Sequence, residues 1–240
     1  MTRPRQSLSD WMDSPLGALT TGTESALAEQ ACERAFGDVA VQIGLWGKAD
    51  LFLQHCRTRT AVLAAPKPAD GVDLVCKPES LPLASDSVDL LLLPHTLELS
   101  ERPQETLREA QRVLVGDGRV VLMCFDPFSL WGLGRRLGRI PAPRNASLSI
   151  RRLFDWLSLL GLEMTHSQRY LYIPPVNHAA VARQADTWAA VGRRLWPFAS
   201  GAFFVVARKR IYTGMPVRRR TPRRTPEVVP LAKPIAREPR

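Results

Sequence analysis

The sequence predicts an α/β protein with a mostly parallel sheet of seven strands. Two observations support this class. Short apolar segments with the length of buried strands alternate along the chain with segments of helical periodicity. The segment Ser87–Leu93 is almost continuously apolar, which is typical of a strand buried on both faces of a sheet. Strands joined through helices pair in parallel with right-handed crossovers, so most of the sheet is expected to be parallel.

The expected elements follow from local signals. Thr23 is the expected cap of a helix over 24–36, and Gly37 suits its end. Ser149 is the expected cap of a later helix that stops at Gly161. Further helices are expected at 48–56, 103–115, 129–138, 150–160 and 178–195. The seven strands are expected at 39–43, 60–65, 72–76, 87–93, 119–125, 162–173 and 201–210.

The 240 residues divide into three parts. Residues 1–23 are expected to form an N-terminal lead-in, with Trp11 and Leu16 as anchors. Residues 24–210 are expected to form the folded domain, a length that suits one α/β unit with a sizeable core. Residues 211–240 are rich in Arg and Pro. They have too little apolar surface to offset the entropy of ordering, so a disordered or extended tail is expected.

The tail carries most of the positive charge. The chain has a net charge of +10, but Arg208–Arg240 contains eleven Lys/Arg and two Glu, which leaves about +1 for residues 1–207. The segment Arg218–Arg224 has five arginines in seven positions and no aromatic residue between them. Such a segment attracts the phosphates of nucleic acid or of anionic lipid without sequence selectivity. A solvated tail without a partner is an equal alternative.

Cysteine, histidine and hydropathy patterns exclude several classes of protein. The four cysteines form no CxxC pair, so small core residues are expected rather than metal ligands. The four histidines show no HxxxH or HExxH spacing, so no zinc site is expected. No apolar segment reaches the roughly 18 residues of a transmembrane helix. No apolar stretch follows the first residues as in a signal peptide, so a cytoplasmic protein is expected.

The stretch Leu81–Gly118 carries a family resemblance. Its motifs are Leu81-Pro82-Leu83, Ser87-Val88-Asp89, Leu97-Glu98, Leu107-Arg108-Glu109, Arg112-Val113-Leu114 and Gly116-Asp117-Gly118. In order and spacing they resemble the second half of a class I S-adenosylmethionine-dependent methyltransferase, in the type-11 subgroup that includes ubiquinone/menaquinone C-methyltransferases. The resemblance implies a Rossmann-like sandwich with a C-terminal antiparallel hairpin and S-adenosylmethionine as cofactor. Asp89 and Arg112 are expected to hold strand and helix ends rather than to perform chemistry.

The resemblance places the cofactor at the carboxyl ends of the central strands, starting with the turn after the first strand. The family has an acid there, followed by three glycines at alternate positions. In this chain Gln42 replaces the acid, Gly44 matches the first glycine, Trp46 stands at the second, and Gly47 lies one place before the third. Glycines let the backbone approach a cofactor closely. These four residues are candidate cofactor ligands; alternatively, Gly44–Gly47 is a tight turn over which Trp46 packs.

Two further family positions should contact the ribose and the adenine. The second strand normally ends in an acid that accepts bonds from both ribose hydroxyls, but here it ends in Ala65-Pro66, and Asp70 lies too far along the chain. The acid that meets the adenine falls near Lys77, and the nearby Glu79 is the better candidate. Leu81, which opens the Leu-Pro motif, is a further candidate for cofactor contact.

Pro94 and His95 follow the fourth predicted strand, where the resemblance places the reacting methyl group. Pro94 is therefore a candidate cofactor contact. His95 is the candidate catalytic residue, because an imidazole with a pKa near neutrality can act as a general base. A polar loop residue that only lines the pocket is the alternative. Methyl transfer from a sulfonium needs mainly positioning, so a base is optional.

Three functions are compatible with these patterns. The first is a methyltransferase acting on a small or lipophilic acceptor, with the apolar-basic segment Phe128–Leu137 as a lid over the acceptor, as a membrane contact, or as an ordinary packed helix. The second is a catalytically inactive binding or regulatory protein that keeps the sheet and has lost the cofactor contacts. The third is a nucleic-acid-associated protein that binds through its tail.

Overall fold

The computed structural model describes residues 11–136, 148–176, 178, 183–195 and 200–210. The tail with Arg218–Arg224 and the first ten residues of the expected lead-in lie outside the described residues. None of the helices in the described ranges is long and apolar enough to span a lipid bilayer.

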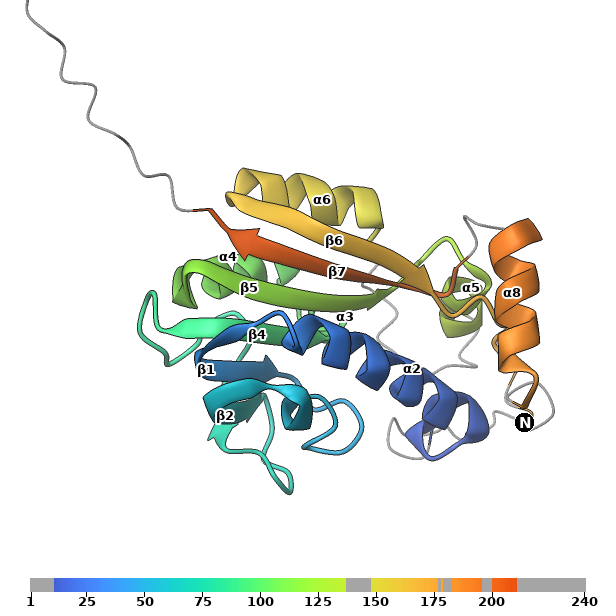
Figure 1. Cartoon of the computed structure of the whole chain (residues 1–240), viewed down its shortest axis with the longest axis horizontal. Coiled ribbons are helices and arrows are strands. Elements are labelled where there is room, and N and C mark those ends of the chain that lie inside the picture. The colour runs from blue at the N-terminus through green and yellow to red at the C-terminus, as the bar shows by residue number, and fades with distance from the viewer. Residues whose placement is uncertain (1–10, 137–147, 177, 179–182, 196–199, 211–240) are drawn as a thin grey trace, which may run out of the picture.

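A seven-stranded sheet forms the centre of the molecule (Figure 1). The strands are β1 (Phe36–Ile43), β2 (Arg57–Ala65), β3 (Leu74–Val75), β4 (Val88–Pro94), β5 (Leu114–Phe125), β6 (Leu162–Tyr170) and β7 (Ala202–Lys209). Their order across the sheet is β3-β2-β1-β4-β5-β7-β6. The first five strands in this order pair in parallel, whereas β7 pairs antiparallel with both β5 and β6. The prediction of a mostly parallel sheet with an antiparallel C-terminal pair is confirmed.

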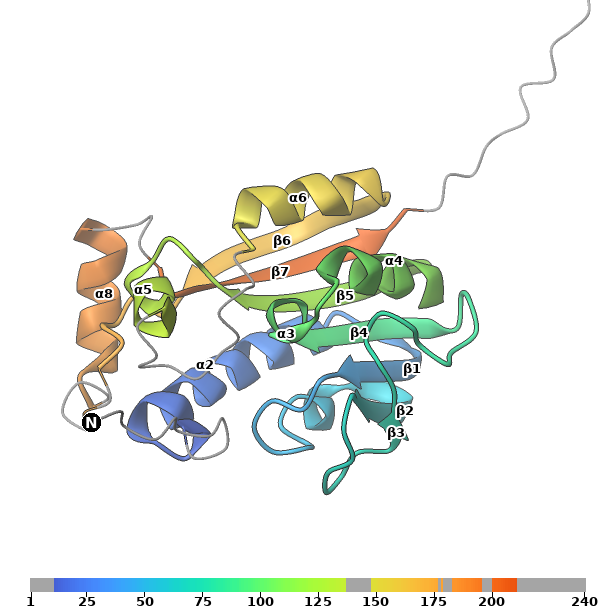
Figure 2. The ribbon, with the colours of Figure 1, turned by 180° about the vertical axis from the view of Figure 1, so that it is seen from behind.

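Helices cover both faces of the sheet. The helices are α2 (Pro15–Cys32), α3 (Thr96–Leu99), α4 (Pro103–Val113), α5 (Leu130–Arg136), α6 (Ile150–Leu159) and α8 (Ala185–Leu195), with a 3₁₀ turn η1 (Leu53–His55). Helix α2 packs on one face, and α4 and α6 pack on the other (Figures 1 and 2). Helices α5 and α8 lie beyond the end of the sheet at which β5 terminates (Figure 1).

The N-terminal helix differs from the prediction. It begins at Pro15, because the Ser14 hydroxyl accepts a hydrogen bond from the Gly17 amide at 3.2 Å and proline suits the first helical position. Thr23 lies inside the helix, where its hydroxyl donates to the Leu19 carbonyl at 2.8 Å. The expected boundary at residue 23 therefore falls within α2, and Gly37 lies in β1 rather than ending a helix.

The segment after β1 also differs. A helix was expected over 48–56, but only the three residues of η1 are helical. Gly44 and Gly47 adopt positive φ angles of 97° and 75°, which an α-helix does not allow. The connection from β1 to β2 therefore begins with a turn. Helices α4, α5 and α6 lie within their expected ranges, whereas α8 begins at Ala185 instead of 178, and residues 179–182 of that expected helix lie outside the described residues. Ser149 caps α6, and the helix gives way to Gly161 with φ of 69°.

Asp89 and Arg112 hold backbone segments together, as expected. The Asp89 carboxylate accepts hydrogen bonds from the amides of Asp38 and Val39 at 2.9 and 3.0 Å, at the start of β1. The Arg112 guanidinium donates to the carbonyls of Leu81 and Leu83 at 3.0 and 2.9 Å. It also forms a bidentate pair with Glu109, with both distances 2.8 Å. Arg112 therefore fastens the loop before β4 to α4.

Replacing Arg112 by alanine is expected to lower the free energy of unfolding by about 2 kcal/mol, because two backbone carbonyls and Glu109 lose a charged donor. Urea denaturation followed by circular dichroism measures this change. Arg108→Ala is the matched control, since Arg108 is exposed on the same helix and its loss should change stability by no more than about 0.5 kcal/mol. Equal stability of both variants would contradict the fastening role.

Candidate functional site

The carboxyl ends of β1, β4 and β5 meet at one edge of the sheet, where ligands bind in open α/β folds. The Gly44–Gly47 turn leaves β1 at this edge, and His95 follows β4. A side chain at Gly44 would approach the Thr96 hydroxyl to 3.0 Å. Thr96 itself donates to the Ile43 carbonyl, so the glycine allows β1 and β4 to end close together.

Five side chains from distant segments meet beneath this edge. We refer to Glu24 (α2), Trp46 (the turn after β1), His95, Glu98 (α3) and Tyr170 (end of β6) as the Glu24 cluster. All five are buried, and Glu24 is 0% and His95 1% exposed. The Glu24 carboxylate accepts hydrogen bonds from Trp46 Nε1 at 2.7 Å and from the Tyr170 hydroxyl at 2.9 Å. It also contacts His95 Nε2 at 2.9 Å. One helical carboxylate thus joins three strand ends.

His95 lies between two carboxylates. Its Nε2 faces Glu24 Oε1 at 2.9 Å, and its Nδ1 faces Glu98 Oε1 at 3.3 Å. A carboxylate accepts hydrogen bonds, and only a doubly protonated imidazole can donate from both nitrogens. Burial alone would lower the pKa of His95, but the negative charges of Glu24 and Glu98 raise it to about 9. His95 is therefore a buried cation at neutral pH, with no lone pair to accept a proton.

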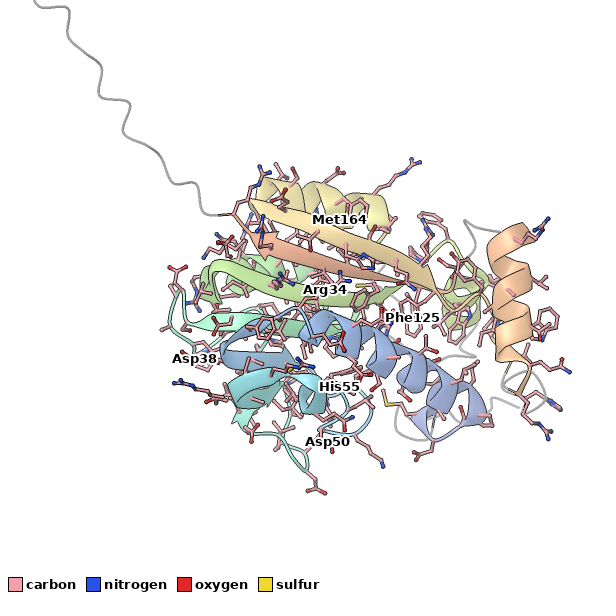
Figure 3. The ribbon with its side chains drawn as sticks, viewed as in Figure 1. Arg34, Asp38, Asp50, His55, Phe125 and Met164 are labelled. Carbon is pink, nitrogen blue, oxygen red and sulfur yellow. The ribbon has the colours of Figure 1, made fainter. Side chains whose placement is uncertain are left out.

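Aromatic rings enclose this cation. The His95 ring lies 4.1 Å from the Trp46 ring and 4.2 Å from the Phe125 ring, measured between centroids. Phe125, labelled in Figure 3 at the end of β5, stacks in turn on Trp131 of α5 at 5.6 Å. Aromatic faces attract a cation, so the stack adds to the two carboxylates in holding the protonated form. The backbone of His95 has a φ of 53°, which is uncommon for a residue with a side chain.

Tyr170 completes the cluster as a neutral donor. Burial raises the pKa of its phenol well above the usual value, and the negative charge of Glu24 raises it further. The hydroxyl therefore keeps its proton and donates a hydrogen bond to Glu24. Three partners on one carboxylate supply Glu24 with the polar contacts that a buried acid needs in the interior.

The structure brings some of the sequence-based candidates together and separates others. Gly44, Trp46, Pro94 and His95 share the edge formed by β1 and β4. Gln42 is fully buried in β1, where its amide donates to the Gly44 carbonyl at 2.9 Å. Its carbonyl oxygen is a buried acceptor with no hydrogen-bond partner among the described residues.

Gly47 lies on the outer side of the turn. Its amide approaches the Met12 sulfur at 3.0 Å. It also lines a cavity of about 840 Å³ between α2 and the segment that follows β1. The polar residues of that cavity include Thr21, Ser25 and Lys48. The cavity therefore borders the turn and does not include His95 or Trp46.

Glu79 and Leu81 serve the fold in this structure. The Glu79 carboxylate accepts hydrogen bonds from the Ser100 hydroxyl and from the Arg102 amide. Burial would raise the pKa of Glu79, but these bonds lower it. Leu81 is buried, and its amide donates to Glu109 at 2.9 Å. Ala65 at the end of β2 is buried and followed by an exposed Pro66, so no carboxylate occupies the ribose position predicted by the resemblance.

Sequence reasoning missed Glu24, Glu98 and Tyr170. A helix start at Pro15 would have placed Glu24 in register with Leu16, Thr20 and Leu27 on the buried face of α2, which is an unusual place for an acid. Glu98 follows His95 by three residues, the spacing of one helical turn. Tyr170 lies 146 residues from Glu24, and no local pattern points to it. Within the described ranges, no group of three or more His, Cys, Asp or Glu side chains is arranged to hold a metal ion.

Comparisons with known proteins agree with this architecture. Residues 52–122 match the family model described as a methyltransferase domain, which is less than half of the chain. An uncharacterised protein of Escherichia coli K12, YafS, is 40% identical over 79 residues. That alignment spans 32% of this chain and 33% of YafS, so the chain matches about a third of the length of its curated relative.

Solved structures show the fold over most of the chain. A protein from the complex with the Haloferax volcanii Trm112 methyltransferase activator has a TM-score of 0.59 and 16% identity, and the superposition covers 86% of this chain and 99% of that one. Geranyl diphosphate C-methyltransferase of Streptomyces coelicolor A3(2), solved with S-adenosyl-L-homocysteine, has a TM-score of 0.55 and 15% identity, covering 78% and 77%. The chain therefore has the Rossmann-like class I methyltransferase fold, and residues 52–122 are similar to the methyltransferase-domain model.

Proposed function

We propose that the protein is an S-adenosylmethionine-dependent methyltransferase that acts on a small or lipophilic acceptor. The observation that carries this proposal is the left-handed glycine turn Gly44–Gly47 at the carboxyl end of β1, next to the end of β4, in a class I methyltransferase fold. Ligands of open α/β sheets bind at this edge, and glycines permit close approach of the backbone. The methyltransferase-domain match over residues 52–122 supports the same reading.

Buried polar atoms around the turn fit part of the cofactor. Among the described residues, the Gln42 carbonyl oxygen is a buried acceptor without a hydrogen-bond partner. The Trp11 indole N–H is a buried donor that also has no partner there. Trp11 lies 6.1 Å from Trp46, centroid to centroid, so this donor is beside the turn. The cofactor's methionine portion carries an ammonium and a carboxylate, which are the matching donor and acceptor. We assign Gln42, Gly44 and Trp11 to that portion.

The ribose portion of the cofactor would meet fewer acids than the family pattern provides. No carboxylate follows Ala65, and Glu79 is engaged by Ser100 and Arg102. Loss of one charge-assisted bond costs roughly 1.5–3 kcal/mol. Two such losses weaken affinity about a hundredfold or more relative to relatives with both acids. We therefore expect binding in the high micromolar range.

Apolar side chains at the same edge support a lipophilic acceptor. Phe128 is 81% exposed just after β5, and Leu130 and Leu133 of α5 are also exposed. They follow Asp126, whose carboxylate pairs with Arg169 at 3.0 Å and accepts from the Phe128 amide at 3.0 Å. This pairing positions the apolar side chains at the edge of the site. A geranyl diphosphate methyltransferase is among the structures with the same fold, and its named acceptor is lipophilic.

The bound cofactor would supply an electrophilic methyl group, and the chain's own residues would position it. In-line displacement needs alignment of donor and acceptor more than proton transfer. His95 is held as a cation by Glu24 and Glu98, so in this arrangement it fixes the ends of β1, β4 and β5 and does not take a proton from the acceptor. An acceptor bound against Phe128 and α5 would cover these exposed side chains and keep water from the reacting centre.

Titration calorimetry with S-adenosylhomocysteine tests the proposal. We expect measurable heat at high micromolar ligand and a change in tryptophan emission, because Trp46 lies at the turn. Trp46→Phe should lose most of that emission change, whereas Trp188→Phe, which replaces an exposed tryptophan of α8, should keep it. A folded protein that shows neither heat nor emission change would exclude the enzyme.

One observation favours a second candidate function. The Trp46, His95 and Phe125 rings stack in the space between the ends of β1, β4 and β5, where the reacting group is expected. A protein that has filled this space with its own side chains would be a catalytically inactive binding or regulatory protein. Absence of cofactor binding, together with normal stability, is the result this second function predicts.

A further inference from the structure

We propose that Cys32 and Cys56 are a redox modification site that forms a reversible disulfide when the folded protein meets a peroxide. Cys32 is the last residue of α2, and Cys56 follows η1 directly before β2. Their sulfur atoms lie 3.5 Å apart, although 24 positions separate the two residues in the sequence. A disulfide needs about 2.05 Å, so a change of about 1.5 Å through side-chain rotation joins them. The site is independent of the proposed methyl transfer.

Neighbouring contacts hold the two segments in this register. The Ser25 hydroxyl contacts His55 Nε2 at 2.9 Å and donates to the Leu51 carbonyl at 3.3 Å. Ser25 precedes Cys32 by seven residues, or two helical turns, and therefore lies on the same face of α2. His55 precedes Cys56, and Figure 3 shows it beside α2. The hydrogen bonds of Ser25 hold the end of α2 against the segment around η1, and this arrangement places the two sulfur atoms opposite each other.

The two thiols have different environments. Cys32 is fully buried, whereas Cys56 is partly exposed. The hydrogen bond from Cys32 lowers the pKa of the Cys56 thiol and outweighs the effect of burial. The same bond, followed by burial, raises the pKa of Cys32. Cys56 is therefore the thiol that ionises more readily and that peroxide can reach, and Cys32 is the resolving thiol.

The chemistry balances with hydrogen peroxide as the oxidant. The Cys56 thiolate attacks one peroxide oxygen, the O–O bond breaks, and hydroxide leaves to become water, which gives a sulfenic acid. The Cys32 sulfur then attacks the Cys56 sulfur, the S–O bond breaks, and a second water leaves with the Cys32 proton. Two thiols lose two electrons in total, and peroxide gains them. An external dithiol such as dithiothreitol reverses the step.

Peptide mapping of the full chain tests the site. After peroxide treatment of the folded protein, free thiols are alkylated in denaturant and the chain is cut with trypsin. We expect fragment Gln6–Arg34 joined to Ala49–Arg57, and dithiothreitol should separate them. The link encloses β1 and the Gly44–Gly47 turn, so oxidation should also raise the melting temperature by on the order of 5–10 °C.

Variants separate this site from general oxidation. Cys76→Ser should keep the link and the melting shift, and Cys56→Ser should lose both. In Cys32→Ala, dimedone should label Cys56 as a trapped sulfenic acid. Full alkylation of both Cys32 and Cys56 in denaturant, after peroxide treatment of the folded protein, would overturn the proposal. So would pairing of Cys56 with Cys76 at a yield equal to that with Cys32.

Discussion

Replacing Glu24 by alanine is expected to lower the free energy of unfolding by about 3–5 kcal/mol. The change removes the acceptor for Trp46 Nε1 and the Tyr170 hydroxyl, which then become buried donors without a partner. It also leaves the His95 cation with Glu98 as its one remaining carboxylate in the Glu24 cluster. Loss of one member of a buried ionic network is costly because the others stay desolvated.

Urea denaturation of purified Glu24→Ala measures this loss. Glu29→Ala is the matched control, since Glu29 is exposed on the same helix and its loss should change stability by no more than about 0.5 kcal/mol. Glu24→Gln keeps the shape and removes the charge, and it should fall between the two. If Glu24→Ala and Glu29→Ala were equally stable, Glu24 could not be the side chain that joins α2 to the three strand ends.

Stability is also expected to fall as the pH rises from about 6.5 to 9, by about 3 kcal/mol. The pKa of His95 is raised to about 9 in the folded protein, above its unfolded value near 6.5, and the negative charges of Glu24 and Glu98 outweigh the effect of burial. A raised pKa in the folded state means that folding favours the protonated form. Its contribution is therefore complete below pH 6.5 and is lost as the pH rises through 9.

Denaturation series at several pH values between 6 and 9.5 measure this dependence. His95→Gln should be less stable at pH 6 and should lose most of the slope, because the titrating group is gone. His166→Gln, which replaces an exposed histidine of β6, should keep the slope. A wild-type stability that stays constant over this range would show that His95 does not carry the charge assigned to it.

The sequence predicted the sheet well because each central strand has a local signal. The apolar run before Pro94 and the amphipathic pattern from Pro103 onwards are short-range features, and they match β4 and α4. The predicted start of this helix at residue 24 is wrong, because the stretch after Pro15 contains Gly17, Gly22 and several threonines, which weaken the helical pattern. Ser14, followed by proline, marks the true start of the helix more clearly than Thr23 does.

The candidate site was predicted only in part, for a physical reason. Trp46 and His95 follow strand ends, so the topology of parallel strands places them at one edge. Their actual partners depend on long-range packing, which a single sequence does not encode in any local pattern. Glu24 was assigned to the first turn of a helix, where an acid is ordinary, and its position on the buried face followed only from the true helix start. No local pattern around His95 indicates that Glu24 lies beside it, so the prediction of a general base does not take this carboxylate into account.

The order of strands at the C-terminal side has a consequence for folding during synthesis. β6 pairs with β7, and β7 lies between β5 and β6, so β6 leaves the ribosome before the strand that joins it to the rest of the sheet exists. Tyr170, the last residue of β6, donates its hydrogen bond to Glu24 from this same strand. The N-terminal helix is thus fully secured only after Ala202–Lys209 has been made. Nascent chains shorter than this expose unpaired edges of β5 and β6, which are surfaces that favour aggregation or chaperone capture.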